Sequence, residues 1–212
     1  MAGANVNRAK EIPTIDCQLV TITIPGATAQ DDPVVIGLDT ASKIQVDIQT
    51  ETQDAVKLII KGVLKAQKKK QVTVTGNQIT LTDNVFTPEV VKILQGGTIT
   101  YDPETGEVTG YTPPVVGESN TLPVFTLTAY SAIYNAAGVC TGYEVCSYPN
   151  CTGNPISMTS EDNVFRVPEY TIDSAPNTGE APYSITYIGA DDLPVLTDPS
   201  DVDVDDVDDN NG

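Results

Sequence analysis

Histidine, the side chain that most often carries acid–base catalysis, is absent from this sequence. Imidazole moves protons near neutral pH and commonly binds zinc, so Ser–His and Cys–His arrangements and histidine-ligated metal sites are excluded. Carboxylates occur throughout the chain, but no pair stands out by its spacing as a tuned acid and base. No glycine-rich phosphate-binding loop is present. We therefore predict that the protein is not an enzyme and uses no cofactor.

Four cysteines are the next candidates for chemistry: Cys17, Cys140, Cys146 and Cys151. Together they could supply four thiolates to zinc, but they lack the closely spaced pairs that are typical of zinc sites. Buried or half-buried thiols that act as small hydrophobic side chains are the favoured interpretation, and we predict no metal site. The N-terminal residues contain no apolar signal segment, so reduced thiols in a cytosol are expected.

Acidity is the strongest compositional feature. The chain has 29 acidic and 11 basic side chains, for a formal charge of -18, and nine of the acidic residues fall after position 190. Proteins that grip nucleic acid need a basic surface, so the composition argues against adhesive DNA binding. Residues 201–206 carry aspartate at the first, third and fifth positions, as the start of a calcium-binding loop does, but the glycine expected at the sixth position is missing. We favour a solvated tail that aids solubility over one that repels DNA or neighbouring particles.

Strand signals dominate the rest of the chain, because threonine repeatedly alternates with valine, isoleucine or leucine. No apolar run reaches the roughly 20 residues that a bilayer-spanning helix needs, and no membrane partner is expected. Frequent turns favour a β-sandwich or partly closed barrel. Strands are predicted at residues 12–24, 43–49, 124–134, 139–148, 156–159, 164–167 and 183–188, with turns at 135–138, 149–154 and 175–181. Hairpins are predicted over 72–81, around Gly76-Asn77, and over 98–111.

One short flanking α-helix is predicted at about residues 88–95. Thr87 is placed as N-cap, Pro88 occupies the first helical position, and Gly96-Gly97 supplies the left-handed stop. A helix of about two turns persists only if its apolar stripe docks on a sheet.

Two segments are candidates for contacts between subunits. The first is the lysine-rich connection near residues 65–71. It belongs to a segment, residues 54–70, that fits both a helical spacing of lysines and a strand-like alternation of apolar residues, and Gly62 argues against the helix. The basic cluster in this region either pairs with acidic surface on a second copy or is a solvated loop tip. The other candidate is the excursion over residues 101–123. The individual candidates are Lys65, Lys68, Lys69, Lys70, Asp102, Glu104, Glu107, Pro113 and Pro114.

The predicted organisation is an N-terminal arm at residues 1–11, a β domain at 12–190 and a disordered acidic tail at 191–212. Four stretches, 79–97, 148–153, 164–176 and 181–187, resemble the major tail (tail tube) proteins of bacteriophages with long non-contractile tails. The most specific parts are the helix with its Gly-Gly stop and the Phe-Arg-Val-Pro-Glu-Tyr segment at 165–170.

That resemblance implies a β-sandwich with one flanking helix, six copies closing into a ring, and rings stacking into a hollow tube through which DNA is ejected. It also implies assembly in the bacterial host cytoplasm, a place in the virion tail, and tape measure, tail tip and terminator proteins as partners. Inner tubes of contractile tails and injection machines are similar and stay as an alternative. A second alternative is a monomeric adhesion module that binds through loops 112–123 and 149–155.

Overall fold

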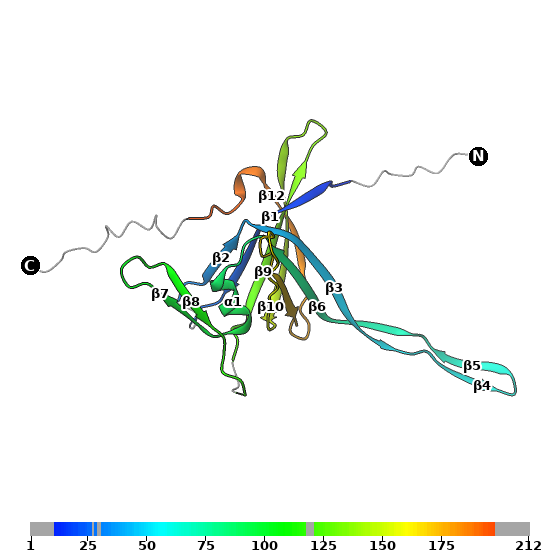
Figure 1. The fold of residues 1–212 in the computed structure, drawn as a ribbon. Helices are drawn as coiled ribbons and strands as arrows, with labels where there is room; N and C mark the ends of the chain where they lie inside the picture. Colours follow the sequence, from blue (N-terminus) through cyan, green and yellow to red (C-terminus); the bar gives the residue numbers. More distant parts are fainter. Residues whose placement is uncertain (1–10, 27, 29–30, 118–120, 198–212) are drawn as a thin grey trace, which may run out of the picture.

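The computed structural model describes residues 11–26, 28, 31–117 and 121–197, and within them the chain is mainly β with a single α-helix (Figure 1). The predicted class, mainly β with one flanking helix at residues 88–95, is therefore confirmed. The strands are β1 (Thr14–Ile24), β2 (Val34–Leu38), β3 (Ala41–Gln53), β4 (Val56–Ile60), β5 (Val63–Lys68), β6 (Gln71–Asp83), β7 (Thr98–Tyr101), β8 (Val108–Thr112), β9 (Phe125–Tyr134), β10 (Cys140–Gly153), β11 (Glu169–Ser174) and β12 (Ser184–Gly189). The helical elements are α1 (Pro88–Gln95) and the 3-10 helix η1 (Ala190–Asp192). No described helix is long and apolar enough to cross a bilayer.

Eight strands form one antiparallel sheet in the order β2-β1-β9-β10-β11-β6-β3, with β12 pairing on β10. Strand β10 pairs with β9 along most of its length, and a register shift between Tyr148 and Cys151 separates the part beside β12 from the end beside β11. Strand β1 contacts β3 although the two are not hydrogen-bonded neighbours, and the sheet is not closed into a barrel.

The core lies between the inner face of this sheet and α1. Side chains from β1, β6, β9, β10 and β11 meet the helix residues Val90, Val91, Ile93 and Leu94, all of them buried. Fully burying one aliphatic side chain of this size stabilises a fold by about 1.5–3 kcal/mol, so docking explains why two helical turns persist. Thr87 occupies the N-cap position without a side-chain cap bond, while Gly96 has φ 81 and ends the helix as predicted.

A long two-stranded ribbon leaves the body of the protein (Figure 1). Strands β3 and β6 pair from Ala41 and Asp83 to Gln53 and Gln71, and β4 and β5 continue as a separate hairpin. We call residues 54–70 the arm. The ambiguous segment is thus a β-hairpin, and its turn residues Lys61 and Gly62 have φ of 50 and 79, as a type I′ turn requires.

Several predicted local features are wrong. The hairpin expected at Gly76-Asn77 does not form, because β6 runs straight through this point and Gly76 lies where the backbone carbonyl of Ser174 comes too close for a Cβ. The turn expected at 149–154 is also absent, since β10 continues through a bulge in which Asn150 has φ 49. Residues 156–159 and 164–167 form no strand, and β11 was not predicted as one.

The described chain ends at Thr197, after η1. Just before this end, the Leu196 side chain lies over Gly37 of β2, so residues 193–197 follow the surface of the sheet. The remainder of the predicted acidic tail, residues 198–212, and residues 1–10 of the predicted N-terminal arm lie outside the described residues.

Candidate assembly surfaces

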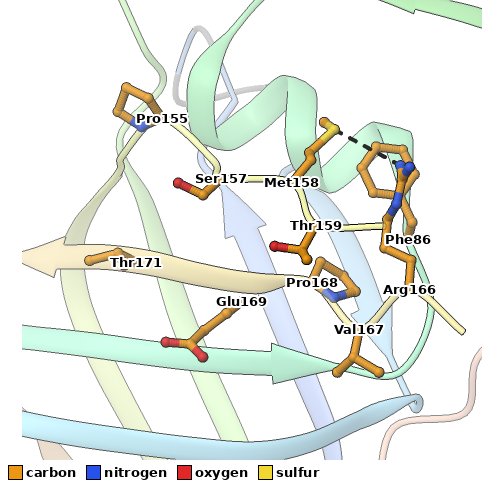
Figure 2. Close-up of a pocket in the computed structure, with 10 residues that line it drawn as sticks. All are labelled: Phe86, Pro155, Ser157, Met158, Thr159, Arg166, Val167, Pro168, Glu169 and Thr171. Carbon is orange, nitrogen blue, oxygen red and sulfur yellow. Dashed lines mark hydrogen bonds between the residues drawn. The ribbon is translucent and has the colours of Figure 1, made fainter. Parts of the chain in front are cut away.

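A pocket beside β11 is the first place to look for chemistry (Figure 2). The Arg166 guanidinium lies 5.6 Å from the centre of the Phe86 ring, and its Nη1 donates to the Met158 sulfur over 3.9 Å. A cation above an aromatic ring is a common stabilising contact. The hydroxyl groups drawn in Figure 2, on Ser157 and Thr159, form no hydrogen bond to the Glu169 carboxylate. The pocket therefore presents no assembled nucleophile and base among its described residues.

The cysteines lie in β1 and β10, where Cys151 is buried and the other three are half-buried, as predicted. Burial raises the pKa of the thiols of Cys17 and Cys146, and raises the pKa of Cys151 to about 11. The Cys151 thiol donates to the Tyr148 carbonyl over 3.2 Å. Because the thiolate is the reactive and metal-binding form, burial favours the less reactive thiol form of Cys17, Cys146 and Cys151.

The arm has one apolar face that no other described segment covers. In the register of β4 and β5, Leu58 pairs with Ala66 and Ile60 with Val63, so these side chains and Val56 share one face. The valines, the leucine and the isoleucine of this face are 47–65% exposed. A two-stranded hairpin is only marginally stable alone in water, so this face needs a partner surface.

The arm is also the basic part of the molecule. Residues 56–70 hold six of the 11 basic side chains and none of the 29 acidic ones. Lys65 and Lys68 lie on β5, while Lys69 and Lys70 connect β5 to β6. These four predicted contact residues therefore lie together on one exposed ribbon.

The other predicted contact residues lie on the opposite side of the molecule (Figure 1). Strands β7 and β8 form a hairpin, which we call the acidic hairpin, whose tip carries Asp102, Glu104 and Glu107. Pro113 and Pro114 follow its second strand. The structure thus separates the lysine group from the acidic group within one chain.

The Asp102 side chain binds the backbone of this tip. Its Oδ1 accepts the backbone N–H groups of Glu104 at 2.8 Å and Thr105 at 3.1 Å, and these bonds lower the pKa of its carboxyl group. An aspartate that binds its own turn in this way fixes the turn conformation. Glu104 and Glu107 are exposed, so their charges are available to another molecule.

A groove runs beside the acidic hairpin, between α1, β2 and β7, with a volume of about 420 Å³. We call it the helix groove. Its apolar lining includes Ile24, Val34, Ile36, Ile93, Ile99 and Leu122. Tyr101 also lines the groove and is followed directly by Asp102, so the acidic tip adjoins the groove.

Sequence reasoning located the charged candidates but missed the apolar face of the arm and the helix groove. The alternation of Val56, Leu58 and Ile60 was a signal for the arm face, and it competed with the helical spacing of the lysines. No local signal reveals the groove, because its walls come from segments far apart in the chain.

Comparisons with known proteins are distant. No family model matches the chain, and no curated protein matches it. Among solved structures, the cryo-EM structure of the anti-feeding prophage cap, described as its tube-terminating cap, is similar at a TM-score of 0.47 and 14% identity, covering 89% of this chain and 100% of that one. The six-fold symmetrised cryo-EM structure of the anti-feeding prophage baseplate is similar at a TM-score of 0.38 and 7% identity, covering 86% of this chain and 98% of that one. Likenesses this distant assign no role to the chain.

Proposed function

We propose that this protein is a structural, non-enzymatic subunit that self-assembles into stacked rings of six copies. The rings make the hollow tail tube of a phage-like particle through which DNA is ejected. The subunit would assemble in a bacterial cytoplasm and reside in the virion tail, beside tape measure, tail tip and terminator proteins. The resemblance of segments 79–97 and 165–170 to tail tube proteins supplies the ring and tube arrangement.

The observation that carries self-assembly is the exposed apolar face of the arm. Monomeric proteins rarely expose a contiguous apolar surface, and they blunt the edges and faces of free ribbons with charge. Here one face of the hairpin holds five apolar side chains in adjacent rows, from Val56 to Ala66. This arrangement is better explained if the arm contacts another subunit than if it is a solvent-exposed loop.

The acidity of the chain supports DNA passage rather than DNA binding. Outside residues 56–70 only five basic side chains remain against all 29 acidic ones. A surface of this charge that lined a lumen would offer phosphates no counter-charges, so DNA would move without sticking.

Negative-stain microscopy of the purified protein over a rising concentration series tests self-assembly. Rings or tubes are expected for the wild-type chain. Replacing residues 54–70 by an Asn-Gly turn should leave a folded subunit that does not assemble. Because Gln53 and Gln71 are cross-strand partners, a two-residue turn closes the ribbon without changing its register.

A gentler variant keeps the arm and removes only its apolar character. Ile60→Thr with Val63→Thr preserves strand propensity and should shift assembly to higher concentration, whereas Gln67→Thr, on the other face, should not. A wild-type chain that stays monomeric at every concentration would refute the proposal and favour a monomeric binding module.

A further inference from the structure

The chain carries two surfaces that match each other in chemistry and cannot meet within one copy. The arm is apolar and cationic, and it points away from the body on the side opposite α1 and the acidic hairpin (Figure 1). The helix groove is apolar and adjoins an acidic tip. Complementary surfaces on opposite sides of one subunit produce head-to-tail contacts, which build rings or filaments.

The apolar parts match in kind. The end of the arm presents the aliphatic side chains of Ile59, Ile60, Val63 and Leu64, all about half exposed. The groove offers isoleucines, a valine and a leucine from β1, β2, α1, β7 and the segment after residue 120. A volume of about 420 Å³ lies within the range of cavities that enclose bound groups.

The charged parts fit in sign. The groove is lined by one acidic and one basic side chain, Glu89 and Lys92, whose formal charges sum to zero. The net charge at its rim is therefore that of the adjoining acidic hairpin. Residues 93–117 contain three acidic side chains and no basic one. Lys61, at the turn of the arm, and Lys65, in β5, are the basic side chains nearest the apolar end.

We propose that the end of the arm of one copy docks in the helix groove of a second copy of this chain, with Lys61 and Lys65 facing Glu104 and Glu107. This inference rests on the proposed self-assembly and names its donor and acceptor surfaces. Docking covers the outermost pair of the apolar face, Ile60 and Val63, together with Ile59 and Leu64 on the other face. The charge pairs select the helix groove, beside the acidic hairpin, over other apolar surfaces.

Charge reversal tests the pairing by sedimentation velocity over a concentration series at low salt. Lys61→Glu with Lys65→Glu places four acidic groups at the contact, and Glu104→Lys with Glu107→Lys places four basic groups there. Each double variant should raise the concentration at half assembly by at least about tenfold, because like charges now face each other. The chain that carries all four substitutions should assemble again near the wild-type concentration.

A mixture of the two double variants sharpens the test. In the mixture a wild-type arm faces a wild-type groove at one contact and a Glu-bearing arm faces a Lys-bearing hairpin at the next, so opposite charges meet at both contacts. The two variants, each defective alone, should therefore co-assemble near the wild-type concentration. The matched control is Glu161→Lys with Asp162→Lys, which makes the same charge change at exposed residues of another loop and should assemble as the wild type does.

The outcomes separate this inference from the proposed function. If the wild-type chain assembles while the Glu104→Lys, Glu107→Lys variant assembles equally well, the groove is not the acceptor and the inference is overturned. If the arm variant fails but the four-substitution chain does not recover, the lysines bind another surface or DNA, and the inference is again overturned. A wild-type chain that never assembles overturns the proposed function together with the inference.

Discussion

The Tyr111 hydroxyl donates a hydrogen bond of 2.7 Å to the backbone carbonyl of Gly96. The same hydroxyl accepts from the Gln95 amide at 2.9 Å, and the Gln95 carbonyl oxygen accepts the Ile156 N–H at 2.9 Å. These bonds join β8, the end of α1 and the loop after β10. They hold the acidic hairpin against the helix and so shape one wall of the helix groove.

Removing this hydroxyl should loosen the hairpin. Carbonyl groups at the end of a helix have no partner within the helix, and Tyr111→Phe leaves the Gly96 carbonyl without its donor. We expect the free energy of unfolding to fall by about 1 kcal/mol, with faster hydrogen exchange in residues 98–112. Tyr101→Phe, at an exposed position on the same hairpin, is the matched control. Equal urea unfolding curves for wild type and Tyr111→Phe would contradict this role.

The buried Asp83 carboxylate depends on Thr40. The Thr40 hydroxyl donates to Asp83 Oδ1 at 2.5 Å, and the Val85 N–H lies 3.4 Å from the same oxygen. Leaving a buried polar group without its partner costs about 1–3 kcal/mol, so Thr40→Val should destabilise the fold by this amount while Thr40→Ser should not. Ser42→Ala, at an exposed position two residues along, serves as control in the same urea titration. A Thr40→Val protein as stable as the control would show that Asp83 is satisfied without Thr40.

Stability should fall at alkaline pH through Cys151. Its pKa rises from the ordinary value of 9.0 to about 11, because burial favours the neutral thiol. Below pH 9.0 the thiol is protonated in both folded and unfolded chains, and its contribution to stability is complete. Between there and a pH of about 11 the unfolded chain ionises first, so the free energy of unfolding falls by at most about 1.4 kcal/mol per pH unit.

Urea unfolding of wild type and Cys151→Ala over this pH range isolates the effect, since other titrating groups are common to both proteins. The difference between the two should shrink as pH rises. A constant difference would show that the Cys151 thiolate is tolerated in the folded protein.

Substitution by alanine should destabilise the fold more at Gly153 than at Gly37. A Cβ at Gly153 would meet the backbone of Leu94 in α1, so Gly153→Ala must displace the helix and should cost about 3 kcal/mol. A Cβ at Gly37 would clash with the end of the flexible Leu196 side chain and make an ordinary contact with Leu19, so Gly37→Ala should cost less than about 1 kcal/mol. The Gly37 variant should instead expose residues 193–197 to proteolysis. Equal costs in thermal unfolding would contradict this ranking.

The sequence by itself determined the elements whose signals are local. The helix at Pro88–Gln95 was predictable because its first-turn proline, apolar stripe and glycine stop all lie within ten residues, and the β7–β8 hairpin because its turn chemistry is contiguous. The absence of histidine and the excess of acidic residues are properties of composition alone.

Only the tertiary structure decided how the strands pair and which surfaces stay open. The sequence around Gly76 predicts a turn, but in the fold the Ser174 carbonyl approaches Gly76 too closely for any side chain. The sequence around Asn150 also predicts a turn, but Asn150 lies in a bulge inside β10. The helix groove exists because β2, α1 and β7 come together in the fold. Strand pairing and groove formation join residues far apart in the chain, so no local pattern encodes them.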